Sequence, residues 1–143
     1  MDKLAEEIAI EREYITQTLS TLRKALERPE KSDIELTAIG ACLHHCYNGI
    51  ENILKRVLKF QKILIPDSPS SHKDLLDIAL QQGLISDEVS ENLDSYRGFR
   101  HFFVHGYGAM LREEDLEPLA LKLPDVWSQF YSEIEEYIRR MTR

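Results

Sequence analysis

The chain has 143 residues, of which 43% are apolar and 30% charged, so it is long enough to bury the core of one domain. It has no apolar run near 18 residues and opens with an acidic amphipathic stretch instead of a signal peptide, so we expect a cytoplasmic protein with no membrane span. The net charge of −7 argues against a broad nucleic-acid surface, so any such contact must be local, and it equally suits a basic protein partner.

The first half of the chain predicts two long helices. Apolar residues at helical spacing indicate a first helix from about residue 2 to residue 28. Ser32 is a plausible N-cap for the second helix, because Asp33 and Glu35 place negative charge in its first turn. An apolar heptad seam then runs without a break to Leu64, so we expect the second helix to span about 33 residues and to form the spine of a bundle.

Two shorter helices follow a loop rich in proline and serine. The apolar spacing predicts a third helix over residues 71–81, ended by Gly83. Ser86 is a plausible cap for a fourth helix, since two acidic residues follow it directly. Gly106 and Gly108 mark the place where this fourth helix is expected to end or loosen.

The last segment, from about residue 113 to residue 140, keeps helical spacing to the end of the chain. Pro124 should kink this helix or split it in two. The sequence has no internal repeat and no alternating strand pattern. We therefore predict an all-α fold, an up-down helical bundle of about five helices, in a single domain over residues 1–143.

The end of the fourth predicted helix carries the string Arg100-His101-Phe102-Phe103-Val104-His105-Gly106-Tyr107. A guanidinium holds a phosphate through two parallel hydrogen bonds and an imidazole moves protons near neutral pH, so Arg100 and His105 suffice in principle for phosphodiester chemistry without a metal. With this composition an Arg-x4-His spacing is expected about 0.35 times by chance, so it is weak evidence alone. Requiring Tyr107 as well lowers the expectation to roughly 0.015, which makes the longer string informative.

This string resembles the signature of the HEPN superfamily, specifically the Arg-x4-His-x-Tyr pattern of HepT-like toxins. The segment from Cys46 to Leu54, Cys-Tyr-Asn-Gly-Ile-Glu-Asn-Ile-Leu, is similar to the long second helix of the same group, and the length and helix order also fit. The resemblance implies a compact helical homodimer that needs no cofactor. It also implies a partner, the small nucleotidyltransferase antitoxin called MNT.

The resemblance further implies a metal-independent endoribonuclease, the toxin of a type II-like toxin-antitoxin pair, which cleaves RNA by attack of the ribose 2′-hydroxyl. Arg100 and His105 would be catalytic, with His101 in support. Arg97 lies one turn before His101, and from that position it could add positive charge at the mouth of the cleft. Tyr107 would accept AMP from the antitoxin, and such a group beside Arg100 would occupy the phosphate site and repel RNA. The alternative is an inactive HEPN bundle that serves its nucleotidyltransferase as a binding module or nucleotide acceptor; the acidic charge favours it and the intact signature opposes it.

The same residues have structural interpretations. Arg100 lies on an apolar seam, where it could reach the rim or pair with a carboxylate, and Tyr107 could be a core aromatic. His105 lies about 140° around a helix from Arg100, so the two align only if the glycines redirect the helix end or if two subunits share a cleft. His105 could also be a partly buried, hydrogen-bonded histidine, and Arg97 a solvated residue. Glu51, in the second string, is expected to be solvated or ion-paired.

A metal site is not expected. His101 and His105 have the spacing of two zinc ligands, but the sequence offers no third or fourth ligand nearby. Cys42, His45 and Cys46 share a helix face, yet three ligands within a single turn rarely close a tetrahedral site. We expect these last three to be core or near-core residues, with the two cysteines reduced.

Overall fold

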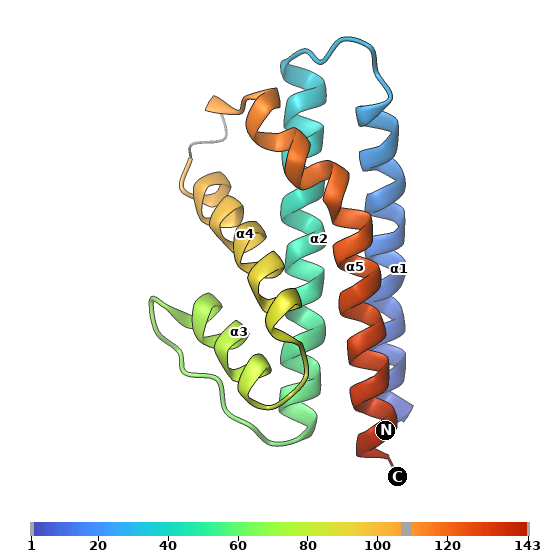
Figure 1. Cartoon of the computed structure of the whole chain (residues 1–143), viewed down its shortest axis with the longest axis vertical. Helices are drawn as coiled ribbons and strands as arrows, with labels where there is room; N and C mark the ends of the chain where they lie inside the picture. Colours follow the sequence, from blue (N-terminus) through green and yellow to red (C-terminus); the bar gives the residue numbers. More distant parts are fainter. Residues whose placement is uncertain (1, 107–109, 143) are drawn as a thin grey trace.

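The computed structural model describes residues 2–106 and 110–142, and within these ranges it contains five α-helices and no strand. The helices are α1 (Asp2–Leu26), α2 (Asp33–Phe60), α3 (Ser71–Gln81), α4 (Asp87–Val104) and α5 (Glu113–Met141). Figure 1 shows α1, α2 and α5 as long neighbouring rods, with α3 and α4 on the other side of α2. The predicted all-α bundle is confirmed.

α2 is the central helix of the bundle and contacts each of the other four. Its heptad seam is buried from Ile39 to Val57, and a second row beside it is buried at Tyr47, Leu54 and Leu58. Two adjacent buried rows allow one helix to pack against neighbours on several sides. The prediction that this helix forms the spine is therefore correct.

The N-terminus of α2 is fixed by a capping box. The Ser32 hydroxyl accepts a hydrogen bond from the Ile34 N–H (3.2 Å), and the Ser32 N–H donates to the Glu35 carboxylate (3.0 Å). These bonds satisfy backbone donors that have no partner within the helix. Ser86 caps α4 in a similar way by accepting from the Val89 N–H (3.2 Å), so both predicted caps are confirmed.

The C-terminus of α2 differs from the prediction: the helix ends at Phe60, not at Leu64. Lys62 has a positive φ of 61°, and the Ile63 N–H donates back to the Leu58 carbonyl at 2.9 Å. This is a left-handed helix ending, which usually carries glycine, so a lysine at this position does not predict it. Leu64, the last residue of the supposed seam, is 90% exposed.

α5 runs unbroken from Glu113 to Met141 although Pro118 and Pro124 lie inside it. Of the two outcomes expected at Pro124, the split does not occur. Figure 1 shows α5 bent instead, in its N-terminal half, which contains both Pro118 and Pro124. Leu123 and Val126, on either side of Pro124, are buried in the core. Burying these side chains offsets the cost of a proline inside a helix, which is about 3 kcal/mol.

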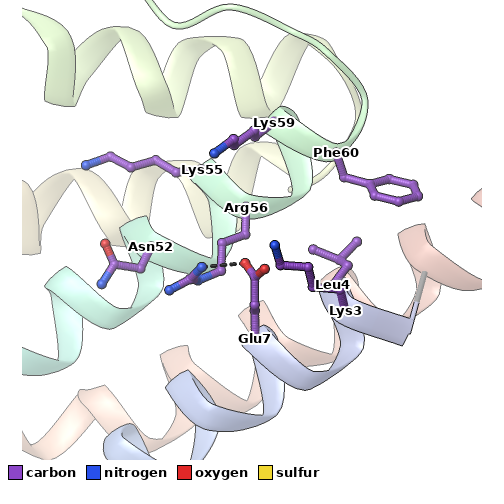
Figure 2. Close-up of a pocket in the computed structure, with 8 residues that line it drawn as sticks. All are labelled: Lys3, Leu4, Glu7, Asn52, Lys55, Arg56, Lys59 and Phe60. Carbon is purple, nitrogen blue, oxygen red and sulfur yellow. Dashed lines mark hydrogen bonds and ion pairs between the residues drawn. The ribbon is translucent and has the colours of Figure 1, made fainter.

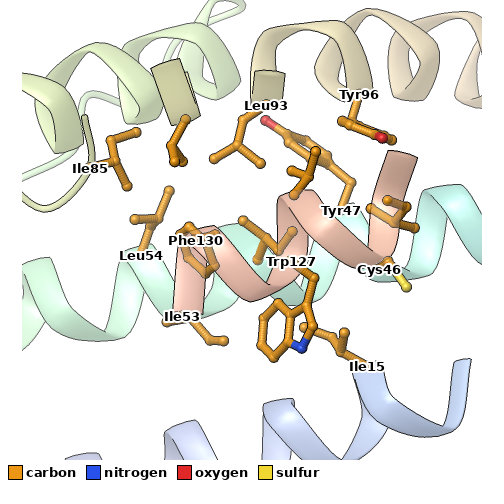
Figure 3. Close-up of a cluster of buried hydrophobic side chains, with 14 of the residues drawn as sticks. Ile15, Cys46, Tyr47, Ile53, Leu54, Ile85, Leu93, Tyr96, Trp127 and Phe130 are labelled. Atoms are coloured by element: carbon orange, nitrogen blue, oxygen red, sulfur yellow. The ribbon is translucent and has the colours of Figure 1, made fainter. Parts of the chain in front are cut away.

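The core that positions α4 lies between α2, α4 and α5, where Figure 3 shows Tyr47, Leu93, Tyr96 and Phe130 gathered. Tyr96 is buried, and its hydroxyl donates to the Leu119 carbonyl of α5 at 2.7 Å. This bond holds the middle of α4, one turn before Arg100, against α5. The last turn of α4 is therefore anchored from inside the bundle.

Candidate functional site

The signature string lies where α4 ends. Val104 is the last helical residue, and His105 caps the helix with its N–H donating to the His101 carbonyl at 3.1 Å. Gly106 follows with φ of 85°, a left-handed conformation that glycine adopts without strain. Gly106 thus ends the helix as predicted, whereas Tyr107 and Gly108 lie outside the described residues.

His101 and His105 form an exposed pair at this helix end. Their ring centroids are 4.1 Å apart and the rings are tilted by 55°. Both side chains are open to solvent, as a group that exchanges protons with a large substrate must be. The structure therefore brings together two of the predicted site residues.

Arg100 is half-buried, and its surroundings leave the guanidinium without a partner. The Nε atom is buried, and no hydrogen-bond acceptor lies within reach of it in the described part of the chain. None of the described carboxylates forms an ion pair with Arg100, so the pairing interpretation finds no support in the structure. Buried donors are normally satisfied, and an Arg that lacks an acceptor can take an anion such as a phosphate oxygen.

The charge of Arg100 acts on two residues of α2, His44 and Tyr47. Burial lowers the pKa of His44, and the positive charges of His45 and Arg100 lower it further. The His44 ring packs against Phe103 of α4, with centroids 5.3 Å apart. A neutral imidazole thus lies beside Arg100, and it is a residue that the sequence analysis missed.

A buried carboxylate of α2 lies one turn after Tyr47. Glu51 is only 2% exposed, and both its oxygens lie within 3.0 Å of His72 Nδ1, at 2.8 and 3.0 Å. Burial and the negative charge of Glu51 raise the pKa of Tyr47, so its hydroxyl keeps its proton. The solvated interpretation of Glu51 is therefore wrong, because the carboxylate is buried against His72, a contact that is ionic when the imidazole is protonated. Its partner His72 could not be found by local spacing, because it comes from α3.

In the described structure, the two arginines of the predicted site, Arg97 and Arg100, are not hydrogen-bonded to the histidine pair. Arg97 donates from Nε to the Asp94 carboxylate at 2.7 Å, and no hydrogen bond joins it to His101 or His105 in the described structure. Arg100 and His105 are likewise not joined by a hydrogen bond within residues 2–106 and 110–142. One molecule therefore presents the guanidinium half-buried and the imidazole exposed, as two separate groups.

The cysteines of α2 fit their structural interpretation, whereas the expectation that His45 is a core or near-core residue is wrong, because its side chain is exposed. Cys42 and Cys46 are buried and unpaired. Within the described ranges, no group of three or more His, Cys, Asp or Glu side chains could hold a metal ion. In the same ranges, no helix has the length and apolar character needed to cross a membrane.

A family model described as HepT-like protein matches residues 38–141, which include Arg100, His105 and almost all of α2. The chain belongs to the HepT-like family. This membership places it in the HEPN superfamily and confirms the resemblance carried by the signature string. Comparison with curated proteins and with solved structures gave no match.

The placement of Arg100 beside His44 can be tested by titration. Arg100→Ala should raise the pKa of His44 toward its ordinary value of 6.5, because it removes a nearby positive charge and admits water. Since the folded pKa of His44 is lowered, its neutral form stabilises the fold above that ordinary value, and this contribution is lost as the pH falls through the lowered pKa. Histidine ring signals followed by NMR against pH report the change directly.

Arg97→Ala is the matched control, since it removes an equal charge that is paired with Asp94 and does not contribute to the lowered pKa of His44. The His44 titration should stay as in the wild type. If Arg100→Ala also leaves this titration unchanged, the guanidinium does not face His44 in solution.

Proposed function

We propose that this HepT-like protein is a metal-independent endoribonuclease and the toxin of a toxin-antitoxin pair. The observation that carries the proposal is the buried Arg100 Nε, which lacks an acceptor among the described residues. Arg100 directly precedes the exposed His101 and lies five residues before the exposed His105. A phosphate group of RNA would supply the missing acceptor. The exposed imidazole would then have access to the protons that phosphodiester cleavage moves.

The reaction requires no nucleophile from the protein. The ribose 2′-oxygen attacks the adjacent phosphorus and forms a P–O bond, while His105 as general base takes the 2′-hydroxyl proton. The bond between phosphorus and the 5′-oxygen breaks, and that oxygen takes a proton from an imidazolium or from water. Arg100 stabilises the charge that grows on the non-bridging oxygens. The products are a 2′,3′-cyclic phosphate and a free 5′-hydroxyl.

The separation of Arg100 from His105 supports a site shared by two copies of the chain. One copy holds the guanidinium half-buried against α2, and its own His105 caps the end of α4. In a homodimer, two signature segments facing one cleft would let Arg100 of each copy act with His105 of the other. Val104, which is 49% exposed between these residues, supplies apolar surface for such a contact.

We also propose that an MNT-type nucleotidyltransferase silences the toxin by adding AMP to Tyr107. This tyrosine follows His105 by two positions in the sequence. An AMP group there would bring negative charge to the region of Arg100, where it would compete with the RNA phosphate. Arg97 and His101 would support the site by adding positive charge and by orienting His105.

Cleavage by the purified chain in EDTA tests the nuclease. The wild type should cut single-stranded RNA and leave 2′,3′-cyclic phosphate ends. His105→Ala should lower the rate about 10²- to 10⁴-fold, as loss of a general acid or base does. Arg100→Ala should lower it about 10²- to 10³-fold through loss of charge stabilisation. Gel assays with end-group analysis measure both effects.

Arg139→Ala, which removes an exposed arginine near the end of α5, is the control and should cut RNA at the wild-type rate. Circular dichroism establishes that each variant is folded. Full activity in folded His105→Ala would contradict the assignment of this residue.

A second function has its own support: an inactive bundle that binds the nucleotidyltransferase or serves as its nucleotide acceptor. The net charge of −7 favours this function, because a polyanionic substrate is repelled by such a surface. It becomes the better account if unmodified wild-type protein cuts none of a broad RNA pool.

Intact mass spectrometry tests the modification separately from cleavage. After incubation with ATP and an MNT-type nucleotidyltransferase, the wild type should gain the mass of one or more AMP groups and lose any RNA cleavage. Tyr107→Phe should gain none. Tyr14→Phe, which alters a tyrosine that is 66% exposed on α1, should be modified like the wild type. Modification of Tyr107→Phe to the same extent would place the acceptor elsewhere.

A further inference from the structure

Three lysines that the signature does not include gather where α2 ends: Lys55, Lys59 and Lys62, hereafter the α2 lysine cluster. All three are exposed, and none forms an ion pair with a carboxylate of the described residues. Lys55 and Lys59 line two adjacent hollows of about 590 and 450 Å³. In a protein of net charge −7, this is a local concentration of positive charge.

The first hollow lies between α1 and α2 and is drawn in Figure 2. Its acidic residue, Glu7, is already engaged by Arg56, which also reaches Glu11 at 3.4 Å. Lys55 and Lys59 point away from Glu7 in Figure 2. The carboxylates of α1 therefore balance the charge of Arg56 and leave the α2 lysine cluster uncompensated.

The second hollow contains the histidine that Glu51 holds. It is lined by Lys55, Lys59, Lys62 and His72, with Asp67 as the one acidic side chain of its lining. Because His72 Nδ1 contacts the buried Glu51 carboxylate, the ring is fixed in orientation and its Nε2 remains available to a ligand. A fixed imidazole beside three lysines has the chemistry of a phosphate site.

Lys55 and Lys59 share one face of α2 with the residues next to Arg100, and Lys62 follows the end of this helix. Lys55 follows His44 by eleven positions, which is about three turns and about 16 Å along the helix. Asn48 follows His44 by one turn and continues the same polar face, and its Nδ2 lies 3.2 Å from His44 Nε2. A chain of phosphates starting at Arg100 could therefore follow α2 to the cluster.

We propose that the α2 lysine cluster, with His72 oriented by Glu51, is a second phosphate-binding site that holds the RNA backbone away from the scissile bond. The inference rests on the proposed nuclease function and adds to it how an acidic protein retains its substrate. A polyanion is favoured over an acidic protein surface, because the lysines line hollows and because Lys55 and Lys59 lie one turn apart on one helix, as successive phosphates require.

RNA binding by fluorescence anisotropy tests the proposal, using a labelled single strand of about 16 nucleotides. All proteins carry His105→Ala, so binding is measured without cleavage. Lys55→Gln/Lys59→Gln should weaken binding about tenfold, and the slope of log K against log salt should become shallower by about 1.4, since two phosphate contacts are lost. These residues are exposed, so the fold should be retained, which circular dichroism checks.

Lys24→Gln/Lys122→Gln removes the same charge from exposed positions of α1 and α5 and is the matched control. It should keep the affinity and the salt slope of its parent. Equal affinity and equal slope in the two double variants would overturn the proposal. So would lysine-dependent binding of polyglutamate without lysine-dependent binding of RNA, because the cluster would then be a docking site for acidic proteins.

Failure of the second phosphate site and failure of the nuclease proposal give different results. Lysine-dependent RNA binding by a wild-type chain that never cleaves RNA would contradict the nuclease alone. Cleavage lost in His105→Ala, combined with lysine-independent binding, would contradict the second phosphate site alone.

Discussion

The structure depends on one constraint: α2 must pack against four helices while one of its faces stays polar. Its buried rows exclude water along nearly its whole length, and the only buried charged residue in the described core, Glu51, is accommodated because His72 approaches it from α3. A buried carboxylate without such a partner is costly to the fold. The polar chemistry of α2 is therefore part of how the bundle is assembled.

The same constraint shapes the candidate site. Tyr96 and the aromatic residues of α4 hold its last turn against the bundle, so that Arg100 lies half-buried beside His44 and Tyr47. Gly106 then ends the helix and leaves His105 in solvent. A metal-free phosphodiester cleavage needs a cation to stabilise the phosphate charge and a group that transfers protons, and Arg100 and His105 have these two chemistries.

The helices, two of their caps and the signature residues could be predicted from the sequence, because each depends on a local pattern. Apolar spacing located the helices, Ser32 and Ser86 marked two caps, and the signature string singled out Arg100 and His105. The misplaced end of α2 has a local cause, a lysine in a conformation that glycine usually adopts. The surroundings of Arg100 were not predictable, since His44 and the Glu51–His72 pair are brought together by packing between helices distant in sequence. Pro124 does not split the last helix, because burial of the residues on both sides of it outweighs its local cost.

The most direct test of the account is to mix the two inactive variants, Arg100→Ala and His105→Ala, and measure RNA cleavage in EDTA. If the site is shared between two copies, mixed dimers contain one intact pair, Arg100 from one subunit and His105 from the other. The account therefore predicts that the mixture regains a substantial part of the wild-type activity, while each variant alone stays inactive. Subunit exchange is verified by native mass spectrometry. Mixed dimers that form and remain inactive would contradict a site shared across the dimer.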